Sequence, residues 1–214
     1  MSLSPKAQAI YDQIDPASTK LGDLKKMAKE IKRDHDLALE LWSSGEYLPR
    51  QLAVLVMDKN LLTQEVLDQL DADMQIHPSA EQTRMMEWLM ANQLMKGKKT
   101  TALIESWADS PRPLQRRTFW YHQGRLRWTG KTLHENTSEL LDAIESQIAD
   151  EVPEVQWAMN FTAAWIGIFD EPYRDRCIQI GETNGLYKDE VVPKNCTPNY
   201  LPEFIRIEVG KRNQ

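Results

Sequence analysis

The chain has 214 residues, 41% of them hydrophobic, and its 26 Lys/Arg and 32 Asp/Glu give a formal net charge of −6. This length favours one domain with a sizeable core, with two small domains as the alternative. The negative charge argues against a protein that coats nucleic acid over its whole surface. Glycine is scarce, at 9 residues, while Leu, Glu, Lys, Ala, Met and Gln are plentiful, a composition that favours helix over strand.

Neither a targeting segment nor a bound metal is expected. The N-terminus lacks a basic start followed by an apolar run, and no apolar stretch approaches the roughly 20 residues of a membrane helix. Cys177 and Cys196 lie far apart without a CxxC pattern, which argues against structural zinc and a disulfide framework. The four histidines show no ligand spacing, and phosphate-loop and HExxH motifs are missing. We expect a soluble cytoplasmic protein with no cofactor, no metal and no membrane partner.

The first quarter of the chain reads as four helices. Residues 3–14 form a short amphipathic helix, and apolar residues recur at helical spacing from Leu21 to Ile31. A further short helix contains 37–42 and stops at Ser43-Ser44-Gly45. The run 47–57 is nearly continuously apolar and too rich in Leu and Ala for a typical strand, so we expect a buried helix there.

The middle of the chain continues in the same way. Thr63 can cap a helix that extends to Met74, and Ser79 can cap one that extends to about Met95. Lys96–Lys99 is expected to be a basic turn. A short helix over 100–107 and another over 113–126 follow.

The last third is expected to hold three more helices and a tail. Asn136 or Thr137 opens a helix through 149, Pro153 opens a long one through Phe169, and residues 173–185 form the last, with Gly185 as its stop. After Leu186 the chain is rich in Pro, Gly and Asn. We expect residues 186–214 to be an irregular arm, with one helical turn around 201–208, packed on a single helical-repeat domain of residues 1–185.

About ten helices of 8–17 residues, with no convincing strand, indicate an all-α fold. Short helix pairs in series favour an α-solenoid, in which each antiparallel pair buries its face against the next. No period repeats cleanly, so a generic helical bundle remains an alternative.

One basic window stands out in this acidic chain. Residues 96–131 hold nine Lys/Arg against two acids, Glu105 and Asp109, a local balance of +7 that leaves −13 for the rest. Tryptophans flank and interrupt the window, which suggests a polyanion site because cations neutralise phosphates and aromatic rings stack on bases. The alternative is a mixed-charge surface with the tryptophans in the core. The basic residues are Lys96, Lys98, Lys99, Arg112, Arg116, Arg117, Arg125, Arg127 and Lys131.

Three stretches resemble one known family. They are LGDLKKMAKEIKRDHDLALELWSSGEYLPRQLAVLVM from Leu21, Trp88-Leu-Met-Ala-Asn92 with Leu114-Gln115-Arg116 further on, and the run from Val155 to Pro202. In order and separation they are similar to the DNA alkylation repair family of HEAT-like-repeat DNA glycosylases, over roughly residues 20–200.

The resemblance implies a fold, a partner and an activity. It implies an α-solenoid of HEAT-like helix pairs whose concave basic face holds duplex DNA, damaged or distorted, and a glycosylase that excises N3- or N7-alkylated purines. The family's site pairs a Trp with an Asp four residues later, and adds an Arg and a further aromatic. These roles fall on Trp88, Asn92, Arg116 and Phe161.

Asn92 departs from the family pattern. A carboxylate beside the sugar stabilises the positive charge that develops when the glycosidic bond breaks, and it can orient water. The amide of Asn92 supplies only a dipole. If the carboxylate contributes about 2–4 kcal/mol, an Asn enzyme is slower by roughly 10²–10³. Phe161 in place of a Trp keeps a stacking plane and is a mild change.

The remaining candidates are phosphate contacts. Arg116 suits a phosphate because its guanidinium can donate two parallel hydrogen bonds to it. The further candidates for phosphate contacts are Arg112, Arg117, Lys96, Lys98 and Lys99. The alternatives are ordinary surface charge for these cations, a core position for Trp88, and a buried or surface amide for Asn92. Four other tryptophans are expected in the core: Trp107, Trp120, Trp157 and Trp165. A second functional reading is a non-catalytic helical-repeat scaffold that binds an acidic protein.

Overall fold

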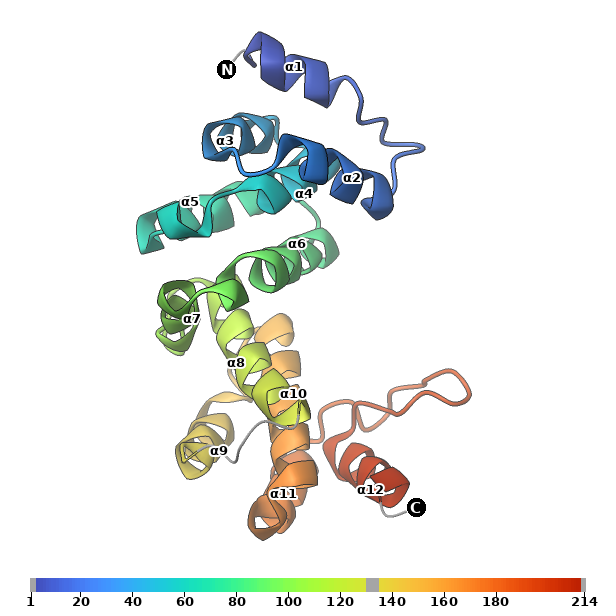
Figure 1. The fold of residues 1–214 in the computed structure, drawn as a ribbon. Coiled ribbons are helices and arrows are strands. Elements are labelled where there is room, and N and C mark those ends of the chain that lie inside the picture. The colour runs from blue at the N-terminus through green and yellow to red at the C-terminus, as the bar shows by residue number, and fades with distance from the viewer. Residues whose placement is uncertain (1–2, 130–134, 213–214) are drawn as a thin grey trace. The chain divides into compact units, whose positions relative to one another are not determined.

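The computed structural model describes residues 3–129 and 135–212, and all regular structure in these ranges is helical (Figure 1). The chain forms two compact units, Met1–Ser106 and Trp107–Gln214. The basic window therefore begins in one unit and continues in the other. Lys131 and His134 lie outside the described residues.

The first unit consists of short helices joined by tight turns. Apolar residues from most of these helices form its core, and α4 is its most buried element, with Leu52, Ala53 and Val54 inaccessible to solvent. The expected buried helix over 47–57 is confirmed by α4. The α-helices are α1 (Pro5–Tyr11), α2 (Leu21–Ile31), α3 (His35–Ser43), α4 (Tyr47–Val56), α5 (Gln64–Met74), α6 (Ser79–Asn92) and α7 (Lys98–Glu105), and the 3₁₀ turns are η1 (Lys59–Leu61) and η2 (Leu94–Lys96).

Side-chain caps mark the starts of three helices in this unit, α1, α3 and α5. The hydroxyl of Thr63 accepts a hydrogen bond from the amide of Val66 at 3.3 Å, as expected for the cap of α5. Ser79 differs from expectation: it is the first residue of α6, and Pro78 takes the cap position. Pro78 has an extended ψ of 147°, so the helix begins at the residue that follows it.

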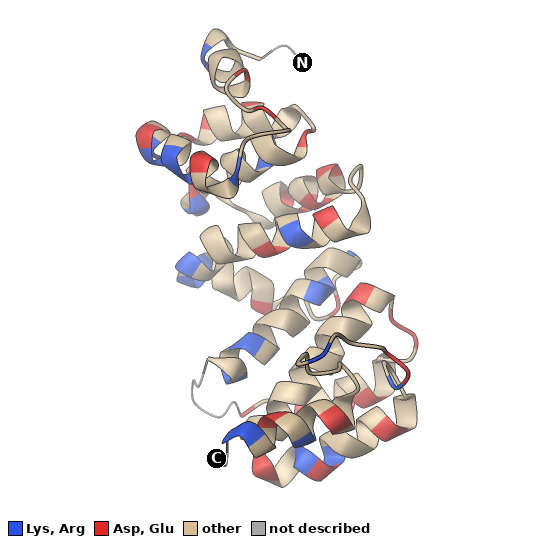
Figure 2. Ribbon diagram, turned by 90° about the vertical axis from the view of Figure 1, so that its right-hand side faces the viewer, with Lys and Arg blue, Asp and Glu red and all other residues tan. Residues whose placement is uncertain are grey.

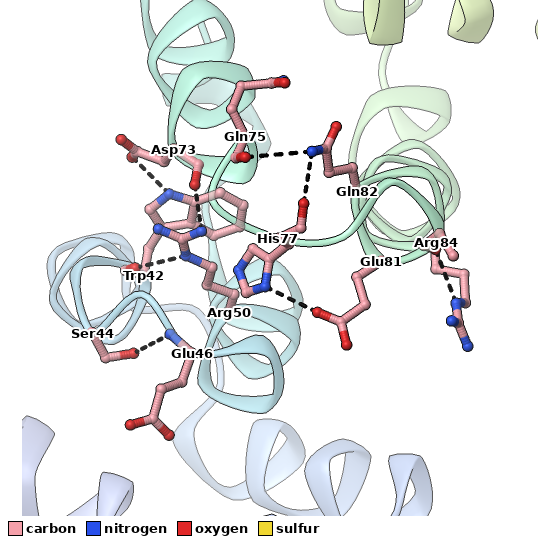
Figure 3. Close-up of polar contacts among 11 residues, drawn as sticks. Trp42, Ser44, Glu46, Arg50, Asp73, Gln75, His77, Glu81, Gln82 and Arg84 are labelled. Atoms are coloured by element: carbon pink, nitrogen blue, oxygen red, sulfur yellow. Dashed lines mark hydrogen bonds and ion pairs between the residues drawn. The ribbon is translucent and has the colours of Figure 1, made fainter. Parts of the chain in front are cut away.

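A buried arginine joins three successive helices of the first unit (Figure 3). Arg50 of α4 donates from Nε to the carbonyl of Trp42 at 3.1 Å and from Nη1 to the carbonyl of Asp73 at 2.6 Å. These carbonyls lie at the C-terminal ends of α3 and α5, where a cation is favoured by the helix dipole. The indole N–H of Trp42 also donates to the Asp73 carboxylate at 2.9 Å. Arg50 thereby fixes α4 against both neighbours.

The second unit is built on two long helices. Helix α8 packs along α10, which also contacts α9, α11 and α12. The close approach of α8 and α10 requires Gly124, because a Cβ at this position would lie 2.6 Å from the ring of Phe161. The bounds are α8 (Pro113–Trp128), α9 (Thr137–Gln147), α10 (Pro153–Phe169), η3 (Glu171–Tyr173), α11 (Arg174–Asn184) and α12 (Leu201–Arg212).

A buried ion pair lies inside the second unit. The Nε of Arg127 is 3.6 Å from Oδ2 of Asp170, and the two side chains are only 1% and 4% exposed. The hydroxyl of Thr137 connects them, since it accepts from Arg127 at 2.9 Å and donates to Asp170 at 3.0 Å. Arg127, which the sequence places in the basic window, is thus a core residue and is not available to a polyanion.

The tail is more regular than expected. Residues 201–212 form the three-turn helix α12 in place of one turn around 201–208, and α12 packs on α10 and α11. Leu201 and Ile205 are buried in this contact, and Gly181 allows it because a Cβ there would lie 2.6 Å from Pro202. The sequence of α12 has only a weak local preference for helix, and its packing against α10 and α11 stabilises the helix.

Candidate functional site

Trp88 and Asn92 occupy the last two turns of α6, and both are half-buried. The indole N–H of Trp88 donates to the carbonyl of Gln51 in α4 at 3.0 Å, and Lys25 of α2 lies 5.5 Å from the ring centroid. The Asn92 amide donates to the Trp88 carbonyl at 2.8 Å. The pair shares one helix face, but Asn92 is turned back onto its own helix. The hydrogen bond to Gln51 holds the Trp88 ring against α4.

The lysines at 96–99 surround the start of α7. Lys96 ends η2, while Lys98 and Lys99 occupy the first turn of α7; all three are exposed. Helix α7 has no side-chain cap and no acid in its first turn. Unpaired amides at a helix start attract anions. A nearby lysine, Lys59, donates to the carbonyl of Lys96 at 2.6 Å. A shallow depression of about 500 Å³ here is lined by Met95, Lys96, Gly97, Lys98, Thr101 and Glu105.

Arg116 is held by an acid of its own unit. Its Nε and Nη2 donate to the two carboxylate oxygens of Glu151 at 2.7 and 2.8 Å, and Nη1 donates to the carbonyl of Ser110 at 2.7 Å. The side chains are 18% and 13% exposed. Arg116 lowers the pKa of Glu151 through these hydrogen bonds, so the carboxylate is ionised at neutral pH. A phosphate that binds Arg116 must therefore displace or share this partner.

Phe161 belongs to a group of aromatic rings on α8 and α10. Its centroid lies 5.3 Å from Trp157 and 5.2 Å from Tyr121. Arg117, although buried, has its guanidinium 5.1 Å from the Trp157 centroid and 5.6 Å from that of Tyr121. Such contacts between a cation and a ring are favourable. Phe161 and Arg117 are thus brought together around the same rings, with Phe161 half-buried.

The expected core tryptophans follow the prediction with one exception. Trp107, Trp120 and Trp165 are 2%, 2% and 6% exposed, whereas Trp157 is half-buried beside Phe161. Cys177 is fully buried, and Cys196 is exposed.

The four positions mapped from the family fall in both units, with Trp88 and Asn92 in the first and Arg116 and Phe161 in the second. Arg112 precedes α8 as its cap residue and is partly exposed. Lys and Arg occur on many helices, interleaved with Asp and Glu (Figure 2). The positive charge of residues 96–131 therefore lies at individual side chains and not along whole helices.

Sequence reasoning missed two features. The pairing of Arg116 with Glu151 spans 35 residues, and no local pattern links them. The ring series Trp157, Phe161, Trp165 and Phe169 could have been found, since the spacing of four places these residues on one helix face.

Within residues 3–129 and 135–212, no group of three or more His, Cys, Asp or Glu side chains is placed to hold a metal. None of the helices in this part of the chain has the length and apolar character needed to cross a membrane.

Comparisons with known proteins agree with the resemblance. The model of one protein family, described as DNA alkylation repair enzyme, matches residues 12–179. A solved structure described as "A new family of proteins related to the HEAT-like repeat DNA glycosylases with affinity for branched DNA structures" superimposes with a TM-score of 0.66 at 19% identity. The match covers 98% of this chain and 90% of that chain, and it confirms the HEAT-like α-helical fold. Among curated proteins there is no significant match.

Proposed function

The chain belongs to the DNA alkylation repair enzyme family, and on this premise we propose that it binds duplex DNA that is damaged or distorted. The observation that carries the proposal is the set of exposed cations at the start of α7, Lys96, Lys98 and Lys99, where free helix amides add to the attraction for phosphate. The structural neighbour is described as having affinity for branched DNA, and a deformed DNA substrate for this chain is in line with that description.

We propose that any glycosylase activity on N3- or N7-alkylated purines is weak. A cationic base is already a good leaving group, so binding and positioning of the lesion nucleotide by Trp88 leave some excision without a carboxylate. Asn92 offers an amide whose N–H is already donated to the Trp88 carbonyl. It has neither the charge to stabilise the sugar cation nor the basicity to activate water.

Arg116 tests the phosphate contact in the second unit. We expect Arg116→Ala to weaken binding to any duplex sequence and to reduce the slope of log K against log salt by about 1, because one phosphate contact is lost. We expect Glu151→Gln to strengthen binding, since the arginine then keeps its full positive charge for a phosphate. Fluorescence anisotropy with a labelled duplex at several salt concentrations measures both effects.

Arg176 is the matched control for this experiment. It forms the same kind of fork, with Nε and Nη2 donating to Glu145 at 2.8 and 2.6 Å, but on α11. Arg176→Ala should leave DNA affinity unchanged. If Glu151→Gln weakens binding and lowers stability together, Arg116 has only a structural role and the phosphate contact is wrong.

The second candidate function is a non-catalytic helical-repeat scaffold that binds an acidic protein. The net charge of −13 outside residues 96–131 is compatible with an adaptor, and the pairing of Arg116 with Glu151 counts against a phosphate contact at Arg116. The two functions separate at low salt: the scaffold predicts no measurable affinity for duplex DNA, whereas the DNA-binding function predicts affinity that weakens steeply as salt is added.

A further inference from the structure

Helix α10 of the second unit, whose course Figure 1 shows, carries an aromatic residue at every fourth position from Trp157 to Phe169. We call Trp157, Phe161, Trp165 and Phe169 the aromatic ladder. Successive centroids lie 5.3, 5.9 and 5.8 Å apart. From Trp157 to Phe169 the helix rises about 18 Å. Trp128 of α8 joins the ladder, because its ring stacks on Trp165 at 5.9 Å with an interplanar angle of 29°.

The aromatic ladder is buried at Trp165 and exposed to solvent at the rings that stack on Trp165. Trp165 is only 6% exposed, whereas Trp128 and Phe169, which both stack on it, are 48% and 38% exposed. Rings that serve only the core are buried on both faces. Two large rings that continue a stack into solvent leave room for a further planar group at each.

A guanidinium accompanies each exposed ring. Arg125 lies 5.9 Å from the Trp128 centroid, and Arg212 of α12 lies 5.1 Å from that of Phe169. Arg212 forms an ion pair with Glu208, with Nη1 3.1 Å from Oε2. Arg125 has no ion-pair partner among the residues the structure describes, and its buried Nε donates to none of them. Each exposed ring is thus combined with a cation, and the combination matches the base and the phosphate of one nucleotide.

We propose that Trp128 and Phe169 are a binding site for unpaired nucleotides of single-stranded DNA, with Arg125 and Arg212 on the adjacent phosphates. In a duplex the face of each base is covered by its neighbours, so a stacking surface selects bases that have left the helix. The inference rests on the proposed function for the choice of DNA as the polymer, and it adds a substrate class: duplexes that carry a single-stranded segment.

The test compares three labelled DNA probes in anisotropy titrations of the full chain: a 20-nucleotide single strand, a blunt duplex, and a duplex with a single-stranded tail. Trp128→Ala and Phe169→Ala should each lower single-strand affinity roughly tenfold, the order expected for one lost base stack. Trp128→Phe should retain most of the affinity because it keeps a stacking plane. Val191→Ala, at a residue 95% exposed in the same unit, should change nothing.

The outcomes separate this inference from the proposed function. Single-strand affinity that is unchanged in both alanine variants, or undetectable in the parent chain while the duplex binds, overturns the inference alone. Failure of the parent chain to bind any DNA probe overturns both. A 20-nucleotide RNA serves as a fourth probe, and if the alanine variants lose RNA binding while DNA binding is unchanged, the site is an RNA site and the DNA assignment is wrong.

Discussion

Asn92→Asp should raise the rate of excision of N7-methylguanine from duplex DNA by roughly 10²–10³, the largest effect we expect from any single substitution. A carboxylate at this position cannot donate to the Trp88 carbonyl as the amide does at 2.8 Å. It is repelled by that oxygen and turns away from the helix, where it can stabilise the developing sugar cation. Base release measured by chromatography under single-turnover conditions reports the change.

Two variants control this experiment. Asn92→Ala removes the amide without adding charge and should not raise the rate. Ala91→Asp places the same charge one residue earlier, at an exposed position on another face of α6, and should not raise it either. An acid at the last residue of the helix opposes the helix dipole and costs about 0.3–1 kcal/mol of stability, so the variant should still fold. An unchanged rate in a folded Asn92→Asp protein means that the family's site does not map onto Trp88 and Asn92.

Asp170→Ala should lower the free energy of unfolding by about 3–5 kcal/mol, because it leaves the buried Arg127 without its carboxylate. Burial already lowers the pKa of Arg127, and Asp170 counteracts this effect. Urea unfolding followed by circular dichroism measures the change. The matched control is Glu171→Ala. The Glu171 side chain is 84% exposed, so its ion pair with Arg174 should contribute less than about 1 kcal/mol to stability.

A double variant makes this prediction sharper. Replacing both charges, as in Arg127→Met with Asp170→Leu, should restore much of the lost stability because no unpaired buried charge remains. If Asp170→Ala unfolds at the same urea concentration as the parent chain, then the pair does not hold α8 and the start of η3 together as the structure indicates.

The sequence could predict the helices because their determinants are local. Thr63 caps α5, Pro153 starts α10 and Gly185 ends α11 in the left-handed conformation, with φ of 62°, and each of these is readable from neighbouring residues. The tail helix α12 was underestimated because its stability comes from α10 and α11, which are distant in sequence.

The candidate site was predicted less well, for a related reason. Charge counting treats Arg116, Arg127 and Lys98 alike, yet Arg116 is paired with Glu151, Arg127 is buried with Asp170, and Lys98 is exposed at a helix start. The partners lie 35 and 43 residues away in the chain, so composition and periodicity cannot distinguish a structural arginine from a free one. Only the packing decides which cations remain available to phosphate.

The salt dependence of duplex affinity tests the central claim most directly. Each phosphate neutralised by a Lys or Arg adds about −0.9 to the slope of log K against log salt. Contacts from Lys96, Lys98, Lys99 and Arg116 predict measurable binding at low salt and a slope of roughly −3 or steeper, the same for unrelated sequences. A slope near zero, or no binding of the parent chain to duplex DNA at about 20 mM salt where electrostatic attraction is strongest, would contradict the account.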